Sequence, residues 1–249
     1  MSLRKRLSVL AAVAAAAASF LAVLPSTAFA AGTVPSEYVG ADISWPQCGG
    51  GTPADRAYQF AVLGVTGGQP FTPNPCLAAQ YPWAVATGHP EFYINLQYGQ
   101  TNKGPLHCGD QDTGCLAYNY GYETVEWAVQ YAASATGGAS NSAPMFWLDV
   151  ESGNAWSSDP DQNDYVIQGA IDYVQSTMNH PRGVGVYSTS YMWGEIAGSF
   201  APPQVPNWVA GATALNDGVS CVASLWPGGQ VFAIQYLNLD LNLDQDVGC

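Results

Sequence analysis

Basic residues are scarce in this sequence. Its 249 residues include six Lys and Arg against nineteen Asp and Glu, and three of the six are Arg4, Lys5 and Arg6. Nucleic-acid-binding proteins need clustered Lys and Arg to displace the counterions of the phosphate backbone. Proteins that bind anionic membrane surfaces need a similar polybasic cluster. The composition therefore excludes both classes, and we expect no nucleic acid among the partners.

Long hydrophobic runs are equally few. One apolar run, from Val9 to Leu24, follows the three basic residues and precedes Ala28-Phe29-Ala30, a small-x-small cleavage site. This order is typical of a secretory signal peptide, here residues 1–30. No second apolar run is long enough to span a membrane. We therefore expect a secreted protein whose mature chain, residues 31–249, has three basic and nineteen acidic side chains and a formal charge of −16.

Motifs for metal, cofactor or nucleophile chemistry are also lacking. The sequence has no C-x-x-C, and His89, His107 and His180 share no helical or strand spacing, so we expect no metal and no cofactor. No G-x-S-x-G motif for a serine nucleophile occurs. No G-x-G-x-x-G follows the first predicted strand, which argues against a dinucleotide site.

Cysteines, in contrast, are present in an even number after the predicted cleavage site. Six cysteines in an oxidising compartment indicate up to three disulfides, which could pair in fifteen ways. We predict Cys108–Cys115, because the short loop between them brings its ends together, and Cys221–Cys249. The pair Cys48–Cys76 is then left by elimination.

Short β-branched and aromatic runs alternate with helix-like segments along the mature chain. This alternation predicts a parallel sheet covered by helices, and eight strands fit a single irregular (β/α)8-type TIM-like barrel domain stapled by disulfides. A doubly wound open sheet is the alternative. The helices should thin out toward the C-terminus, where Gly/Pro-rich connections follow the last predicted helix. The expected strands are Val39–Ser44, Phe60–Val65, Glu91–Gln97, Met145–Glu151, Val184–Ser188, Asn207–Gly211, Val231–Tyr236 and Leu243–Val247, and the expected helices are Asn74–Ala86, Tyr118–Ala135, Asp161–Met178 and Ser190–Ile196.

Two carboxylates end the middle predicted strand, at the end where β/α barrels carry their chemistry. Residues i and i+2 of a strand point to one face, so Asp149 and Glu151 should both face the barrel axis. Phe146, Leu148 and Val150 should then pack against the helices. Two carboxylates this close repel, and one pKa should rise. A protonated acid beside an ionised carboxylate is what glycosidic-bond cleavage needs, although a solvated strand end before a loop is the simpler alternative.

Several short motifs, taken in order, resemble the family-25 glycoside hydrolases, the lysozyme-type N-acetylmuramidases. Gly40-Ala41-Asp42-Ile43-Ser44-Trp45-Pro46-Gln47 is similar to the opening Gly-x-Asp-x-Ser-x-x-Gln strand of this family. Leu148-Asp149-Val150-Glu151 resembles its Leu-Asp-x-Glu strand. Three further segments resemble its Gly-x-Tyr strand, its Trp-hydrophobic-Ala strand, and its Trp-Gln-Tyr followed by Val-Asp-x-Asn: these are Val184–Ser188, Trp208–Ala210, and Ile234–Tyr236 with Leu243–Asp246.

The resemblance implies a β/α barrel that cleaves the β-1,4 bond after N-acetylmuramic acid in peptidoglycan. Glu151 would be the general acid, and Asp149 the partner carboxylate that holds the substrate's acetamido group or stabilises the charge it develops. Asp42 and Asp244 would be the flanking cleft carboxylates. Peptidoglycan or a related glycan would be the partner of a monomeric protein. Candidate substrate-binding residues are Asn95, Tyr187, Trp208 and Gln235.

Two predicted strands depart from the family pattern. The second carries Leu63-Gly64-Val65-Thr66-Gly67-Gly68 where the family has a Lys-Ala-Thr-Glu-Gly-like segment, so an acid expected near the cleft is missing. The third, Phe92–Tyr98, lacks the Tyr-His-Phe pattern. The strongly negative charge also opposes steering onto anionic cell walls. The alternative function is therefore a binding module that holds cell-wall glycan on the same barrel without cutting it.

Overall fold

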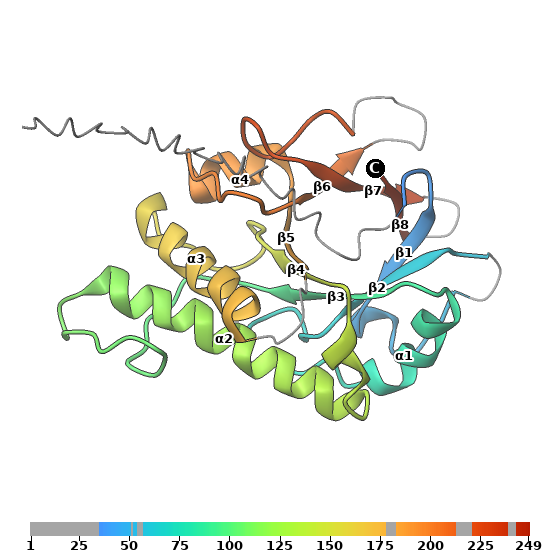
Figure 1. The fold of residues 1–249 in the computed structure, drawn as a ribbon, viewed down its shortest axis with the longest axis horizontal. Coiled ribbons are helices and arrows are strands. Elements are labelled where there is room, and N and C mark those ends of the chain that lie inside the picture. Colours follow the sequence, from blue (N-terminus) through green and yellow to red (C-terminus); the bar gives the residue numbers. More distant parts are fainter. Residues whose placement is uncertain (1–34, 51, 54–56, 178–182, 213–220, 239–242) are drawn as a thin grey trace, which may run out of the picture.

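The protein forms a closed eight-stranded barrel with helices around it (Figure 1). The computed structural model describes residues 35–50, 52–53, 57–177, 183–212, 221–238 and 243–249, so the predicted signal peptide lies outside the described residues. Neighbouring strands follow the order of the sequence, from β1 round to β8. The strands are β1 Val39–Ile43, β2 Phe60–Gly64, β3 Pro90–Asn95, β4 Met145–Asp149, β5 Gly183–Ser188, β6 Asn207–Ala212, β7 Val231–Asn238 and β8 Leu243–Gly248.

Four α-helices accompany these strands in the described part of the chain. They are α1 Leu77–Ala86, α2 Thr113–Ala135, α3 Pro160–Thr177 and α4 Ser190–Ala197, with short 3-10 turns at η1 Trp45–Gln47 and η2 Ala139–Ser142. All four were expected. The largest boundary difference is at α2, which begins five residues before the expected start because the Asp112 side chain caps it by accepting a hydrogen bond from the Cys115 amide at 3.1 Å.

The expectation of an all-parallel sheet is wrong at β8. This strand runs antiparallel to both of its neighbours, β7 and β1, while the other neighbouring pairs are parallel. Only residues 239–242 separate β7 from β8, and a parallel crossover needs a dozen or more residues. The reversal has a functional consequence. It brings the beginning of β8, with Asp244, to the end of the barrel where the other strands finish.

The two faces of the sheet have separate apolar clusters. Phe146, Leu148 and Val150 belong to the outer cluster, which also contains buried residues of the helices, as the alternation along β4 predicts. In Figure 1, α2 and α3 lie side by side on this outer face. The barrel interior has its own smaller cluster, formed by Phe60, Val62, Met145, Trp147, Tyr187, Trp208 and Ala233. The barrel is thus a packed core with its chemistry confined to one end.

The three predicted disulfides are confirmed. Cys48–Cys76, Cys108–Cys115 and Cys221–Cys249 have Cα–Cα distances of 5.5, 5.6 and 5.5 Å, within the ordinary range for a disulfide. Among the described residues, no helix combines the length and apolar character needed to cross a membrane.

Candidate active site

The acid pair of β4 lies at the C-terminal end of the barrel strands. Asp149 is the last residue of β4 and is 4% exposed, whereas Glu151 lies two residues beyond and is only partly buried. One oxygen of Asp149, Oδ2, accepts a short hydrogen bond from Asn95 Nδ2. The pair therefore consists of one enclosed carboxyl and one that solvent and ligands can reach.

Asn95 orients Asp149 because a buried hydroxyl fixes the Asn95 amide. Thr66 Oγ1 donates to Asn95 Oδ1 at 2.6 Å and accepts from the Asn95 backbone amide at 3.1 Å. This leaves Asn95 Nδ2 pointing to Asp149, its register partner on β4. Asn95 was expected to contact substrate, and the structure gives it a hydrogen bond to the acid pair. Thr66 was missed as a site residue, although it lies in the segment where the family pattern places an acid.

Burial and mutual repulsion raise the pKa values of this pair. Burial raises the pKa of Asp149 well above its ordinary range, and the charges of Glu151 and Asp42 raise it further. Burial also raises the pKa of Glu151; a hydrogen bond with Asp149 opposes this shift and the charge of Asp244 adds to it. The sequence predicted one raised pKa, and the structure gives two. Shifts in this direction favour the protonated form of a carboxylic acid.

Asp42 and Asp244 lie with the pair in one group of interacting carboxyls. Burial raises the pKa of Asp42 to about 7, with further contributions from the charges of Asp244 and Glu151. Burial also raises the pKa of Asp244. A relay of hydrogen bonds holds Asp42: Tyr187 Oη donates to Gln235 Oε1 at 2.7 Å, and Gln235 Nε2 donates to Asp42 Oδ2 at 2.8 Å. The four acids predicted from strands far apart in the sequence are thus brought together.

Trp208 does not suit the predicted role of substrate contact. Its side chain is 2% exposed, and its indole N–H donates to Asp246 Oδ1 at 2.9 Å inside the barrel. The ring packs against Tyr187, with a centroid separation of 4.4 Å. Trp208 therefore lies in the barrel interior, below the end that carries the four acids. Its position on β6 alone does not reveal this, because side chains that contact substrate and side chains buried below the acids both point into the barrel.

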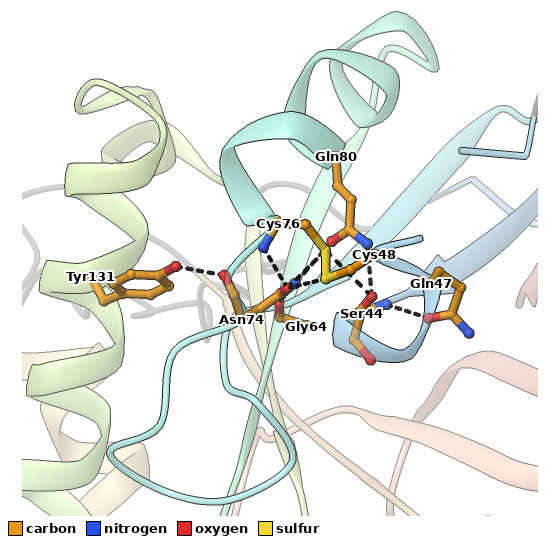
Figure 2. Close-up of a disulfide and its surroundings, with 8 residues drawn as sticks. All are labelled: Ser44, Gln47, Cys48, Gly64, Asn74, Cys76, Gln80 and Tyr131. Carbon is orange, nitrogen blue, oxygen red and sulfur yellow. Dashed lines mark hydrogen bonds between the residues drawn. A yellow bond between two sulfur atoms is a disulfide. The ribbon is translucent and has the colours of Figure 1, made fainter. Parts of the chain in front are cut away.

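A buried polar network holds the segment that follows Asp42 (Figure 2). Gln80 Nε2 donates to the Ser44 carbonyl at 2.7 Å, and Asn74 Nδ2 donates to Gln80 Oε1 at 2.8 Å and to the Gly64 carbonyl at 2.7 Å. The Cys48–Cys76 disulfide joins the same segment to the start of α1. This network fixes the segment from Ser44 to Cys48, which includes η1, against β2 and α1. No cluster of three or more His, Cys, Asp or Glu suited to a metal ion occurs in the described ranges.

Known proteins resemble the chain in part of its sequence and in its fold. A family model described as lysozyme-like protein 1 matches residues 117–215. No curated protein matches the sequence. A muramidase from Acremonium alcalophilum is 17% identical, with a TM-score of 0.57 over 85% of this chain and 93% of that one. A family GH25 lysozyme from Aspergillus fumigatus is 16% identical, with a TM-score of 0.54 over the same shares.

The chain has the fold of the family-25 lysozymes. The resemblance predicted from the sequence motifs is thereby confirmed at the level of the fold. A third structure of similar fold is the modular autolysin LytC from Streptococcus pneumoniae in complex with a synthetic peptidoglycan ligand. It is 15% identical, with a TM-score of 0.55 over 84% of this chain and 46% of that one.

Proposed function

We propose that this protein is a secreted N-acetylmuramidase that hydrolyses β-1,4 bonds of peptidoglycan by carboxylic-acid catalysis. The observation that carries the proposal is the Asp149–Glu151 pair, which stands at the C-terminal end of the barrel with both pKa values raised. The lysozyme-like family model, the muramidases of similar fold and the LytC autolysin solved with peptidoglycan support the substrate class. Three disulfides support a role outside the reducing cytoplasm.

Glu151 suits the general acid because it is the more accessible member of the pair and its burial favours the protonated form. It would protonate the oxygen of the leaving sugar. Asp149 suits the partner that holds or stabilises the acetamido group, because Asn95 fixes its orientation. Asp42 and Asp244 would line the cleft, and in their ionised forms they would stabilise positive charge on the sugar. Tyr187 and Gln235 would act through Asp42, whose position they hold.

Replacing Glu151 by Gln tests the assignment. Because the amide is nearly isosteric but cannot donate the proton that departure needs, kcat should fall by roughly 10²–10⁴-fold with the fold intact. The measurement is reducing-end release, with mass analysis, from purified peptidoglycan near pH 5 and pH 7. Muramic-acid reducing ends from the wild type alone support the proposal. Full activity in Glu151→Gln would remove Glu151 from the acid role.

One observation favours the alternative, a binding module that holds glycan without cutting it. Thr66 occupies the segment where the family pattern has an acid, so the cleft has one carboxylate fewer. Such a module would bind peptidoglycan fragments saturably. Neither the wild type nor Glu151→Gln would then release reducing ends from peptidoglycan. The absence of binding at millimolar ligand would exclude it.

A further inference from the structure

Two carboxyls lie inside the barrel below the cleft, where the proposed reaction does not use them. Asp246 on β8 is 0% exposed and Glu91 on β3 is 1% exposed. Each accepts one indole N–H: Trp208 Nε1 donates to Asp246 Oδ1 at 2.9 Å, and Trp147 Nε1 donates to Glu91 Oε2 at 2.7 Å. The two indole rings meet edge to face at 5.7 Å. Each acid thus fixes one tryptophan side chain of the barrel interior.

Asp246 is connected to the cleft through side chains that contact one another in sequence. Its indole partner Trp208 packs on the Tyr187 ring at 4.4 Å. Tyr187 Oη donates to Gln235 Oε1, and Gln235 Nε2 donates to Asp42 Oδ2. Asp246 also pairs in register with Gln235 on β7 and with Gly40 on β1, two residues before Asp42. A substitution at Asp246 should therefore affect the position of Asp42 in two ways: through the packing of Trp208 on Tyr187, and through the pairing of β8 with β1 and β7.

The surroundings of Asp246 favour its neutral form. Its second oxygen, Oδ2, is buried with no hydrogen-bond partner in the described part of the protein. Burial raises the pKa of Asp246, and so do the charges of Asp42, Asp244 and Glu91, against one opposing hydrogen bond from Trp208. The other titratable groups of the interior are the phenols of Tyr93 and Tyr187, whose pKa values burial also raises. A buried carboxylate with one donor and acidic neighbours is costly, so these surroundings favour the protonated acid.

We propose that Asp246 is a positioning residue that, as the neutral acid, fixes Trp208 and through Trp208, Tyr187 and Gln235 fixes the Asp42 carboxyl. The role of Asp42 as a cleft acid rests on the proposed function. The connection from Asp246 to Asp42 rests on the contacts alone. Asn, the residue of the family pattern at this position, would accept the same indole hydrogen bond without a charge.

Two substitutions at Asp246 separate the parts of this proposal. Asp246→Asn copies the neutral acid in shape and keeps an acceptor for the indole, whereas Asp246→Leu removes the acceptor. The first readout is the NMR resonance of the Trp208 indole N–H, identified by its loss in Trp208→Phe. The second is the carboxyl titration of Asp42, followed by ¹³C NMR from pH 4 to pH 9. Neither readout requires catalysis, so both remain informative if the wild type releases no reducing ends and the proposed function fails.

Asp246→Asn should keep the indole resonance of the wild type, and Asp246→Leu should move it and shift the Asp42 titration. If the protein is a muramidase, kcat of Asp246→Leu should also fall roughly tenfold, the effect of one lost hydrogen bond, with KM little changed. Asp246→Asn should keep the wild-type kcat at pH 5 and remain active to higher pH, because the amide cannot ionise. If Asp246→Asn disturbs the indole resonance as much as Asp246→Leu, the neutral form is not the working one and the proposal falls.

A second pair of variants covers the case in which Asp246→Leu does not fold. Trp208→Phe keeps the ring contact with Tyr187 but loses the indole donor, so it too should shift the Asp42 titration. Trp193→Phe is the matched control, since Trp193 is equally buried and donates its indole N–H to the Phe200 carbonyl at 3.1 Å in the outer layer. It should leave the Asp42 titration unchanged. An Asp42 titration that is identical in the wild type, Trp208→Phe and Trp193→Phe would overturn the proposal.

Discussion

At the scale of single residues, the site depends on neutral polar side chains that hold the acids as much as on the acids themselves. Asn95 and Gln235 each donate one amide hydrogen bond to a carboxyl of the cleft, to Asp149 and Asp42. Each amide is oriented in turn by a hydroxyl, Thr66 for Asn95 and Tyr187 for Gln235. Because an amide can be turned by 180°, the hydroxyl decides whether a donor or an acceptor faces the acid.

Thr66→Val should lower kcat by roughly tenfold while the barrel stays folded. The valine keeps the shape but leaves Asn95 Oδ1 without its donor, so the amide no longer holds its N–H toward Asp149. Steady-state kinetics on peptidoglycan fragments, with thermal unfolding in parallel, measures both effects. Thr66→Ser, which restores the hydroxyl, should recover most of the activity. Equal losses in the Val and Ser variants would show that the hydroxyl alone does not account for the effect.

The acids of the site could be predicted from the sequence, whereas the role of the groups that hold them could not. Asn95, Tyr187 and Gln235 were expected to bind substrate, and their hydrogen bonds go to the acids or to each other. Asp149 and Glu151 are visible because spacing of two on a strand puts both side chains on one face. Thr66 shows no such pattern, since its role depends on a partner 29 residues away. Trp208 was a candidate for substrate binding, and its position on a strand does not show whether its ring is exposed or buried inside the barrel.

At the scale of elements, the outer layer depends on an unusually close approach of α2 and α3. A Cβ added at Gly169 of α3 would lie 2.0 Å from the Tyr118 carbonyl oxygen of α2. A Cβ added at Gly121 of α2 would lie 1.8 Å from the Val166 carbonyl oxygen of α3. The contact is reciprocal, glycine against backbone on both helices. Neither helix can move aside without disturbing the outer cluster beneath it.

Replacing Gly169 by Ala should therefore destabilise the protein by roughly 1–3 kcal/mol or more, because the helices must separate. Gly194 of α4 is the matched control, since a Cβ there would meet nothing within 4 Å. Gly194→Ala should raise the free energy of unfolding by about 0.5–1 kcal/mol, the difference in helix propensity. Urea unfolding of the two variants and the wild type measures these changes. The same sign for both substitutions would contradict the close approach.

Local sequence patterns predicted the positions of the strands and helices, but they did not predict the direction of β8. The eight strands read as short runs of β-branched and aromatic residues, and the structure ends them within about two residues of the expected bounds. The direction of β8 was missed because it depends on the length of a connection and not on the strand. The signal was present, since the predicted strands Val231–Tyr236 and Leu243–Val247 are too close for a crossover.

At the scale of the whole molecule, burial favours the protonated form of the acids inside the barrel. Burial raises the pKa of Glu91 to about 8 from an ordinary value of 4.5, and the hydrogen bond from Trp147 only partly opposes this. Between these two values, the folded protein keeps a proton that the unfolded chain has released. The free energy of unfolding therefore falls as the pH rises through this window. The pKa values of Asp149 and Asp246 are also raised, so these two acids likewise make the free energy of unfolding fall as the pH rises.

Glu91→Gln should flatten this dependence. The amide accepts the same indole hydrogen bond but releases no proton, so the slope should become shallower by about 1.4 kcal/mol per pH unit between roughly pH 5 and pH 8. Urea unfolding at unit steps of pH measures the slope. Glu195→Gln, on the exposed side of α4, is the control and should run parallel to the wild type. Parallel curves for Glu91→Gln as well would mean that Glu91 is already ionised in the folded protein.

The pairing of β1 with β8 joins parts of the chain about two hundred residues apart. The Gln235–Asp42 hydrogen bond alone spans 193 positions. Contacts between residues so far apart in sequence form late and slowly. The entropy cost of closing the long intervening loop comes before the contacts stabilise the structure. Asp42 and Asp244 therefore come together only when β8 pairs with β1 and closes the barrel. Recovery of the raised pKa of Asp42, to which burial and the charge of Asp244 contribute, would time that closure directly during refolding, with no need for an added probe.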